Sequence, residues 1–485
     1  MIRIYFDWNV ISNLKRQENK ELKSFINTHK DYLQFPYSPA HFNDLMKGYS
    51  PDNKYFQEDI ETLEYLAGKH LIRWEKNRTM PLFGAPKEYL EGEKNKEDIF
   101  SLMDMEKVFS DLDETSEDLG LGKMGNLMKS LFKLQPIGFE VNEDNEEMLQ
   151  KMFPSISSNS SMWDLMKEIG PFSKKLLQDK DYYKDFRKTI GNKGFKVEPN
   201  AGNWNVDEVI DKIDEFLEDL DTNITFTEYV ESAFKHRKEP INRYEFFTTA
   251  YLMLDMIGYK ADKLPKPTDN MQNISTDGEH AFYGAHCDFF VACDKNLRIK
   301  AEVLYTKFNI STKVLSPTEF KNSLEKVIHK FPNETNNIIE DALKYIDFNS
   351  IVEYYPVSEE NEVETYAFKL PIFYFNFFNY VVYRFYKEHN SVVLTFKRAF
   401  KNYSDFIFYT EAERLIDKLT ELFGYDDLDE LKKRKKEFIY ENKETQFIWQ
   451  FKGGLIILEK DTETKRPNLT YMILIDKKNT ATNNG

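Results

Sequence analysis

Strand-like runs that alternate with helical patterns constrain the fold of this chain most. The run Ile2 to Phe6 consists largely of β formers and stops at Asp7, after which apolar residues recur at helical spacing as far as Ile26. Tyr32 to Phe35 is again strand-like, and a helix is expected to begin at Pro39. Alternation of strand and helix favours a parallel α/β sheet.

The same alternation returns far along the chain. We expect two helices, a buried strand, a third helix and a last short strand, at Ile241 to Gly258, Asp277 to Ala285, Phe289 to Ala292, Asn296 to Phe308 and Lys313 to Leu315. This order predicts one discontinuous α/β domain, a parallel sheet flanked by helices, formed by residues 1–50 and 240–330.

Residues 51–239 predict an acidic, mostly helical insertion between the two halves of that domain. The strand signal fades there, and the clearest helix is Val206 to Leu220, which carries one apolar face. Between Glu91 and Asp118 there are 11 acidic residues against 3 lysines. Charge of this density is typical of solvated helix faces.

Residues 335–478 predict a separate C-terminal α+β domain. Tyr- and Phe-rich segments come first, followed by a helix from Thr410 to Phe423 and a hairpin pattern from Phe447 to Ile475. Leu370 to Tyr386 is rich in aromatic residues, but it is interrupted by polar residues and is shorter than about 20 apolar residues, so we expect buried core and no membrane span. Residues 479–485 are expected to form a flexible tail.

The charge balance narrows the function. There are 66 Lys plus Arg against 82 Asp plus Glu, a net charge of −16, which argues against attraction of nucleic acid to the whole surface. A polyanionic substrate would have to be held locally or through metal ions. Two cysteines cannot form a disulfide framework and no signal-like run opens the sequence, so we expect a cytoplasmic location.

Four aspartates are expected to meet at one edge of the parallel sheet. Asp7 and Asp294 follow predicted strands at the carboxyl ends, where open parallel sheets present functional groups. Asp44 borders the apolar stripe of the second helix, and Asp277 is expected to open a helix. The carboxylates would repel one another unless a divalent cation neutralised them. Mg²⁺ or Mn²⁺ suits such an all-oxygen site and can support phosphodiester hydrolysis.

At these positions the chain resembles the PIN-domain nucleases. The resemblance rests on Tyr5 to Ile11, Tyr37 to Leu45, Asp277 to Asp294 and Val314 to Phe320. It implies a metal-dependent endoribonuclease with a PIN-like sheet. It also implies that four acids hold the metal, namely Asp7, Asp44, Asp277 and Asp294. Asn9 is implied as a neighbouring polar contact.

Three features depart from the family pattern. The second acid is often Glu in the family but is Asp44 here. Ala292 replaces a Ser or Thr often found two residues before the last acid, which removes one hydrogen bond to the cluster. Asp44 and Asp277 are 233 positions apart, so we expect the insertion to cover or reshape the cleft.

Supporting residues are less strongly indicated. His280 lies one helical turn after Asp277 and would contact a substrate phosphate or a carboxylate, whereas Asp288 either supports the cluster or anchors the start of a strand. A basic run either binds nucleic-acid phosphates or forms the wet face of a helix, and it consists of Lys432, Lys433, Arg434, Lys435 and Lys436. The histidines and cysteines nearby match no usual zinc spacing.

We therefore predict a metal-dependent endonuclease that cuts RNA rather than DNA, as a regulated stress or antiviral effector. A regulatory protein or a second copy of the chain is the expected partner, and no membrane is expected. One alternative is a catalytically weak scaffold that binds RNA or a protein, which the loss of a hydroxyl at Ala292 favours. Another is a DNA nuclease, because the metal chemistry does not read the 2′-hydroxyl.

Overall fold

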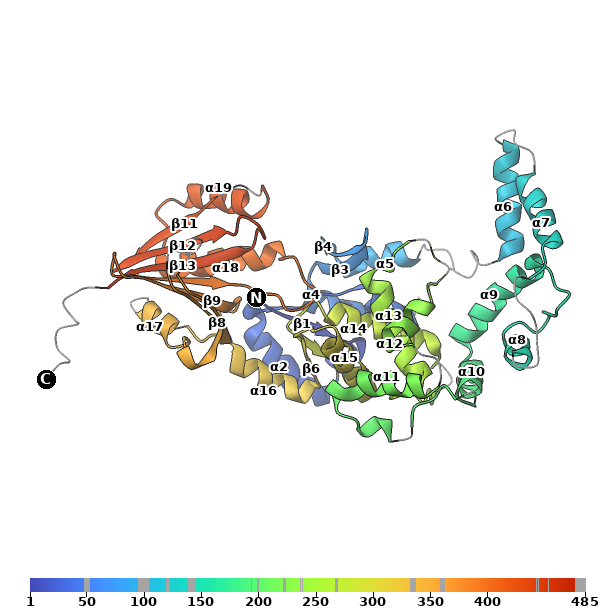
Figure 1. Cartoon of the computed structure of the whole chain (residues 1–485). Coiled ribbons are helices and arrows are strands. Elements are labelled where there is room, and N and C mark those ends of the chain that lie inside the picture. Colours follow the sequence, from blue (N-terminus) through green and yellow to red (C-terminus); the bar gives the residue numbers. More distant parts are fainter. Residues whose placement is uncertain are drawn as a thin grey trace.

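The protein is described from a computed structural model (Figure 1). The described residues are 1–47, 53–94, 104–118, 123–137, 145–192, 194–198, 200–220, 224–235, 237, 239–266, 269–331, 337–357, 363–441, 443, 445–451 and 453–475. The predicted tail 479–485 and part of the acidic stretch between Glu91 and Asp118 lie outside them. The fold is mixed α/β, with a four-stranded parallel sheet and a seven-stranded antiparallel sheet, as the sequence predicts in outline.

The parallel sheet is assembled from both ends of the predicted discontinuous domain. Strand order is β2-β1-β5-β6. β1 (Ile2–Phe6) lies between β2 (Leu33–Gln34) and β5 (Phe289–Val291), and β6 (Lys313–Leu315) pairs with β5. All three pairings are parallel, so the carboxyl ends of β1 and β5 lie side by side.

Helices bury both faces of this sheet, as parallel strands require. On the face of β1 that carries Tyr5 lie α13 (Arg243–Met256), α14 (Met271–Gly284) and α15 (Lys295–Lys307). The face that carries Ile4 and Phe6 is covered by α1 (Trp8–Asn13), α2 (Lys20–His29), α3 (Pro39–Lys47), α4 (Lys54–Ala67) and α16 (Pro317–Val327). The two-residue period of β1 therefore separates two hydrophobic cores.

The insertion is largely helical, but it also holds a β-hairpin that the sequence prediction missed. Strands β3 (His70–Glu75) and β4 (Arg78–Phe83) are joined by Lys76 and Asn77, both with positive φ. Two successive positive φ angles are the geometry of a two-residue hairpin turn, which usually contains glycine. The hairpin forms because the backbone of Tyr37 bonds to β3 and Leu71 and Ile72 are buried.

The helices of the insertion lie at different distances from the parallel sheet: α6 and α7 lie farthest from it (Figure 1), whereas α5, α11 and α12 contribute buried residues to its two cores. In chain order they are α5 (Pro86–Lys94), α6 (Met105–Asp118), α7 (Met124–Leu134), α8 (Glu146–Met152), α9 (Met162–Gln178), α10 (Lys180–Asn192), α11 (Val209–Asp219) and α12 (Phe226–Ser232).

The C-terminal region is a seven-stranded antiparallel sheet in the order β11-β12-β13-β10-β9-β8-β7. Its strands are β7 (Ile351–Tyr355), β8 (Thr365–Tyr374), β9 (Phe378–Tyr386), β10 (Ser391–Lys397), β11 (Phe447–Phe451), β12 (Gly454–Lys460) and β13 (Pro467–Leu474). It packs with α17 (Ile338–Leu343), α18 (Tyr409–Phe423) and α19 (Leu428–Ile439). The segment Leu370 to Tyr386 thus belongs to β8 and β9. Within the described residues, no helix combines the length and apolarity needed to cross a membrane.

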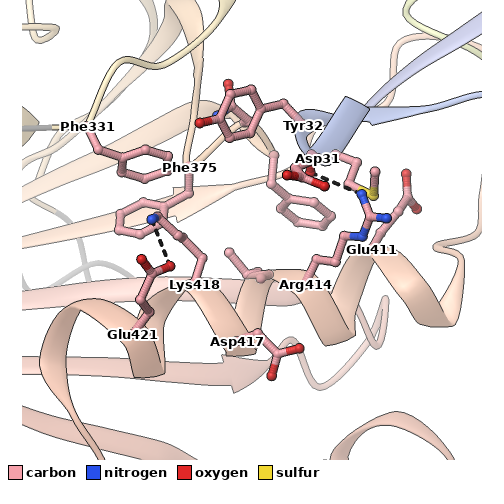
Figure 2. Close-up of a pocket in the computed structure, with 13 residues that line it drawn as sticks. Asp31, Tyr32, Phe331, Phe375, Glu411, Arg414, Asp417, Lys418 and Glu421 are labelled. Atoms are coloured by element: carbon pink, nitrogen blue, oxygen red, sulfur yellow. Dashed lines mark hydrogen bonds and ion pairs between the residues drawn. The ribbon is translucent and has the colours of Figure 1, made fainter. Parts of the chain in front are cut away.

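Buried ion pairs join the C-terminal region to the parallel sheet. Arg3 of β1 pairs with Glu411 of α18 at 2.7 Å, and Arg398 pairs with Asp288 at 2.5 Å. Beside them lies a hollow of about 460 Å³ in which Arg414 donates to the carbonyls of Lys30 and Asp31 (Figure 2). The strand that leads to the candidate site is therefore held at its other end by the C-terminal region.

Candidate metal centre

Asp7 follows β1 and is almost completely buried, with 1% of its surface exposed. Neither carboxylate oxygen has a hydrogen-bond partner among the described residues. The pKa of Asp7 is raised to about 6, chiefly by burial; His280 acts to lower it and the neighbouring Asp44 to raise it. An unpartnered buried carboxylate costs several kcal/mol unless a cation is close. Its chemistry therefore calls for a positive charge.

Asp44 of α3 and His280 of α14 lie beside Asp7. The distance from His280 Nε2 is 3.0 Å to Asp44 Oδ2 and 3.9 Å to Asp7 Oδ1. One ligand atom of each of the three residues lies within 4.8 Å of the others. Burial would raise the pKa of Asp44, but its contacts with His280 and Lys47 hold that pKa below the usual value. Residues from two halves of the chain thus form one small cluster.

A buried polar network fixes the orientation of His280. Because Asp44 is ionised, His280 Nε2 must carry the proton that it donates to Asp44 Oδ2. With that proton on Nε2, the other ring nitrogen, Nδ1, lies 2.9 Å from the Tyr5 hydroxyl and can accept from it. Ser38 Oγ, 2.6 Å from the Tyr5 oxygen, can donate to it in turn. Tyr5, which the sequence prediction did not single out, therefore positions His280 against the carboxylates.

His41 closes the same network in a neutral state. Its Nδ1 accepts from the Ser38 amide at 3.0 Å, so Nε2 donates to the carbonyl of Phe6 at 2.8 Å. Burial, together with the neighbouring His280, lowers the pKa of His41 to about 3. The carbonyl that immediately precedes Asp7 is thus bonded to a neutral donor, and the loop after β1 is held in place.

Asp277 lies on the second turn of α14, which corrects the expectation that it opens the helix. α14 begins at Met271, and Asn270 caps it by accepting from the Asn273 amide. The helix starts earlier because Met271 and Ile274 are buried and extend the apolar face. Burial and the charges of Asp7 and Asp44 raise the pKa of Asp277 well above its usual value. Asp277 therefore belongs to the carboxylate cluster and does not cap the helix.

Asp294 is exposed and caps α15 by accepting from the Leu297 amide at 2.8 Å. It lines an open cavity of about 510 Å³ together with Asp44 and Asp277. The other residues that line this cavity are Trp8, Asn9, Lys47, Asp262, Lys263, Leu264, Pro265, Lys266, Asp269, Asn273, Ile274 and Asn296. The structure thus brings Asp44, Asp277 and Asp294 to one cavity, with Asp7 buried next to it.

Several charged residues of this cavity were not expected from the sequence, and two of them, Lys47 and Asp262, lie in ion pairs. Lys47 pairs with Asp44 at 2.6 Å and so supplies part of the positive charge that the acids need. Asp262 adds a fifth carboxylate and is balanced by the fully buried Lys300 at 3.1 Å. Lys47 lies three residues after Asp44 on the same helix, which is a recognisable ion-pair spacing. Nothing in the local sequence around Asp262 marks it, because it follows a helix end.

Asn9 lines the same cavity as Asp44, Asp277 and Asp294. Asp288, by contrast, does not support the cluster. It stands at the amino end of β5, where its Oδ2 accepts from the Arg3 amide and from Arg398. Parallel strands place their two ends at opposite edges of the sheet, so Asp288 is an anchor of the strand.

The basic run is not at the cavity either. It lies on α19, in the helix layer of the C-terminal region (Figure 1), and each member is paired with an acid. The pairs are Lys432 with Asp429, Lys433 and Arg434 with Glu430, Lys435 with Glu413 and Asp417, and Lys436 with Glu441. Of the two interpretations of this run, the ion pairs favour the solvated helix face.

The donor set fits a hard divalent cation. Asp7 supplies two buried oxygens without partners, and Asp44, Asp277 and Asp294 supply further carboxylates around the same space. Oxygen ligands of this kind suit Mg²⁺ or Mn²⁺, and because His280 Nε2 carries a proton, the imidazole acts as a support for Asp44. Comparison with known proteins gives no match to a family model, to a curated protein or to a solved structure.

Proposed function

We propose that the protein is a PIN-like, metal-dependent nuclease, and that its substrate is RNA. The observation that carries this proposal is the buried Asp7 carboxylate without partners, next to Asp44, at the carboxyl end of a parallel sheet. An orphaned charge in this position destabilises the free protein and is explained if it binds a cation. The order of the four acids along the chain, in the pattern that resembles the PIN domain, supports the reaction class.

In this proposal Asp7, Asp44, Asp277 and Asp294 hold Mg²⁺ or Mn²⁺. The ion would supply Lewis acidity and activate water for attack on phosphorus. Tyr5 and His280 hold Asp44 in position, and the cavity of about 510 Å³ admits the backbone of a nucleic acid. Lys263 and Lys266 also line that cavity and can offset phosphate charge.

A cleavage assay tests this proposal. Labelled single-stranded RNA, structured RNA, single-stranded DNA and duplex DNA are incubated with the protein in Mg²⁺, Mn²⁺ or EDTA. We expect RNA to be cut in the presence of metal only, and the Asp7→Asn plus Asp294→Asn variant to cut nothing. The charge-matched control, Asp207→Asn plus Asp211→Asn, changes two exposed acids of the insertion and should cut like the wild type. Cleavage of DNA alone would redirect the proposal to a DNA nuclease.

One observation favours the second candidate, a catalytically weak scaffold that binds RNA or a protein. Lys47 already neutralises Asp44, and the buried Ala292 offers no hydroxyl to the cluster. The variant Lys47→Met distinguishes a nuclease from a scaffold. If the protein is a nuclease, removing the competing ammonium should tighten Mn²⁺ binding about tenfold, as measured by calorimetry, and cleavage should survive. RNA binding without cleavage in either protein would select the scaffold.

A further inference from the structure

A second cavity, of about 580 Å³, lies between the parallel sheet and the C-terminal sheet. It opens at the amino ends of β5 and β6, where Phe289 and Lys313 begin their strands, so it is at the opposite edge of the parallel sheet from the carboxylates. A volume of this size is typical of sites for small organic ligands. This cavity is not part of the candidate metal centre, which lies at the other edge of the sheet.

Lysines surround this cavity although the chain as a whole is acidic. Lys313, Lys369 and Lys401 line it, and among the described residues no carboxylate pairs with any of their ammonium groups. Lys344 also lines it and is paired with Asp341. In a chain of net charge −16, three lysines without partners around one hollow indicate a site for an anion.

The two acids of the lining do not cancel this charge. The Asp288 carboxylate is neutralised by Arg398 at 2.5 Å and also accepts from the Arg3 amide. Asp347 keeps its charge, since Oδ1 accepts only from the neutral amide and side chain of Asn349, and one carboxylate therefore stands against three lysines. The hollow at Arg414 is different, because Lys418 there is paired with Glu421 (Figure 2).

The loop that carries Lys401 is fixed on both sides. Asn379 of β9 donates to the carbonyl of Ala399 at 2.9 Å and accepts from its amide at 2.8 Å. The Ser311 amide donates to the carbonyl of Lys401 at 2.6 Å. The lysines thus come from three segments whose backbones are held before a ligand arrives, which lowers the entropy cost of binding.

The rest of the lining combines an apolar and aromatic wall, formed by Phe289, Val327, Tyr345, Ile372 and Phe373, with polar side chains such as Ser311, Asn379 and Asn402. We propose that this cavity binds a nucleotide, with its phosphates on Lys313, Lys369 and Lys401 and its base against the aromatic wall. The ligand would contact the parallel sheet and the antiparallel sheet together. This site is independent of the proposed nuclease activity, since it shares no residue with the metal centre.

Calorimetric titration in EDTA tests this site while it excludes metal-dependent binding at the acids. The probes are ATP, pyrophosphate and adenosine. We expect one ATP per chain, with tighter binding than for either fragment, because only ATP uses both the lysines and the apolar wall. The variant Lys313→Gln, Lys369→Gln and Lys401→Gln should weaken ATP binding by roughly a hundredfold or more, since charge-assisted contacts contribute about tenfold each.

The control variant removes the same charge from a solvated helix face, with Lys432→Gln, Lys433→Gln and Lys436→Gln, and should bind ATP like the wild type. Thermal melts without ligand check that both variants fold. If the triple variant fails to fold, Lys369→Gln and Lys401→Gln singly should each weaken binding about tenfold. The absence of saturable ATP binding, or equal losses in pocket and control variants, would overturn the proposal.

Discussion

At the residue scale, Asp7 is the most informative group in the candidate site. It combines complete burial, two oxygens without partners and a pKa raised to about 6. Most buried polar atoms are hydrogen-bonded, and exceptions often mark sites where stability has been given up for function. His280 Nε2 lies 3.9 Å from Asp7 Oδ1 and Lys47 pairs with the neighbouring Asp44, so neither side chain hydrogen-bonds to the Asp7 carboxylate.

We predict that Asp7→Asn abolishes cleavage and stabilises the metal-free protein by about 1 to 3 kcal/mol at pH 8, because a shift of about two pKa units corresponds to that range. The folded pKa lies above the unfolded value of 3.8, so the wild type recovers stability as the pH falls through about 6 toward 3.8. The stability difference should therefore shrink at pH 5. Urea unfolding of both proteins in EDTA measures it, and a destabilised variant at pH 8 would contradict the explanation.

At the element scale, the close packing of α14 on α13 aligns two site residues. Asp277 and His280 flank Gly278, and a Cβ added to this glycine would lie 3.1 to 3.2 Å from atoms of Tyr251. Tyr251 is fully buried, so its ring cannot move away from an added methyl group. The small residue therefore sets how closely α14 approaches, and with it the distance of its polar side chains from Asp7.

Gly278→Ala should therefore cost about 1 to 3 kcal/mol of stability, since overpacking a core displaces the backbone. The displacement should also reduce cleavage, even though no acid is changed. Gly92→Ala, in a helix of the insertion with open space around the glycine, is the matched control. It should be neutral or slightly stabilising, because alanine favours a helix over glycine. Chemical unfolding and the RNA cleavage rate are the two measurements.

At the scale of the whole molecule, the C-terminal region is docked through groups that must be buried together. The Arg3 guanidinium pairs with Glu411 and stacks over the rings of Phe400, Phe406 and Phe408. Arg3 lies in β1 and Asp7 directly follows it, so one short strand links the docking surface to the candidate site.

Arg3→Met should destabilise the protein by about 3 to 5 kcal/mol, because it leaves the Glu411 carboxylate buried without its partner. The double variant Arg3→Met and Glu411→Met should recover most of that loss, since no charge then stays buried. Unfolding monitored by tryptophan fluorescence gives the free energies of the single and double variants. Equal stability of the two variants would show that the ion pair itself is not responsible.

His286 at the same junction should make stability depend on pH. Burial lowers its pKa to about 3, and its Nδ1 donates to the carbonyl of Phe282. The folded pKa lies below the unfolded value of 6.5, so its contribution is complete above pH 6.5 and is lost as the pH falls from 6.5 toward 3. Relative to His286→Phe, the wild type should lose about 1 kcal/mol between pH 6.5 and 5.5, because the unfolded histidine is already half protonated at pH 6.5. Urea midpoints at the two pH values measure this difference.

Local sequence was enough for the elements whose pattern is strong. The β formers Ile2 to Phe6, the cap and proline before α3, and the apolar runs of β5 and β6 all predicted the observed elements, because burial on both faces leaves little freedom. The hairpin of the insertion was missed because the turn at Lys76 and Asn77 lacks the usual glycine.

By itself, the sequence determined the order of strands and helices in the parallel-sheet domain and the aspartates that follow strand ends, because these depend on local periodicity and turn chemistry. Only the tertiary structure decided that Asp7 is buried without a partner, that Tyr5 orients His280, and that Asp288 belongs to the opposite edge of the sheet. These outcomes depend on contacts between residues that are hundreds of positions apart. Burial and electrostatic environment are properties of the packed chain, and no local pattern encodes them.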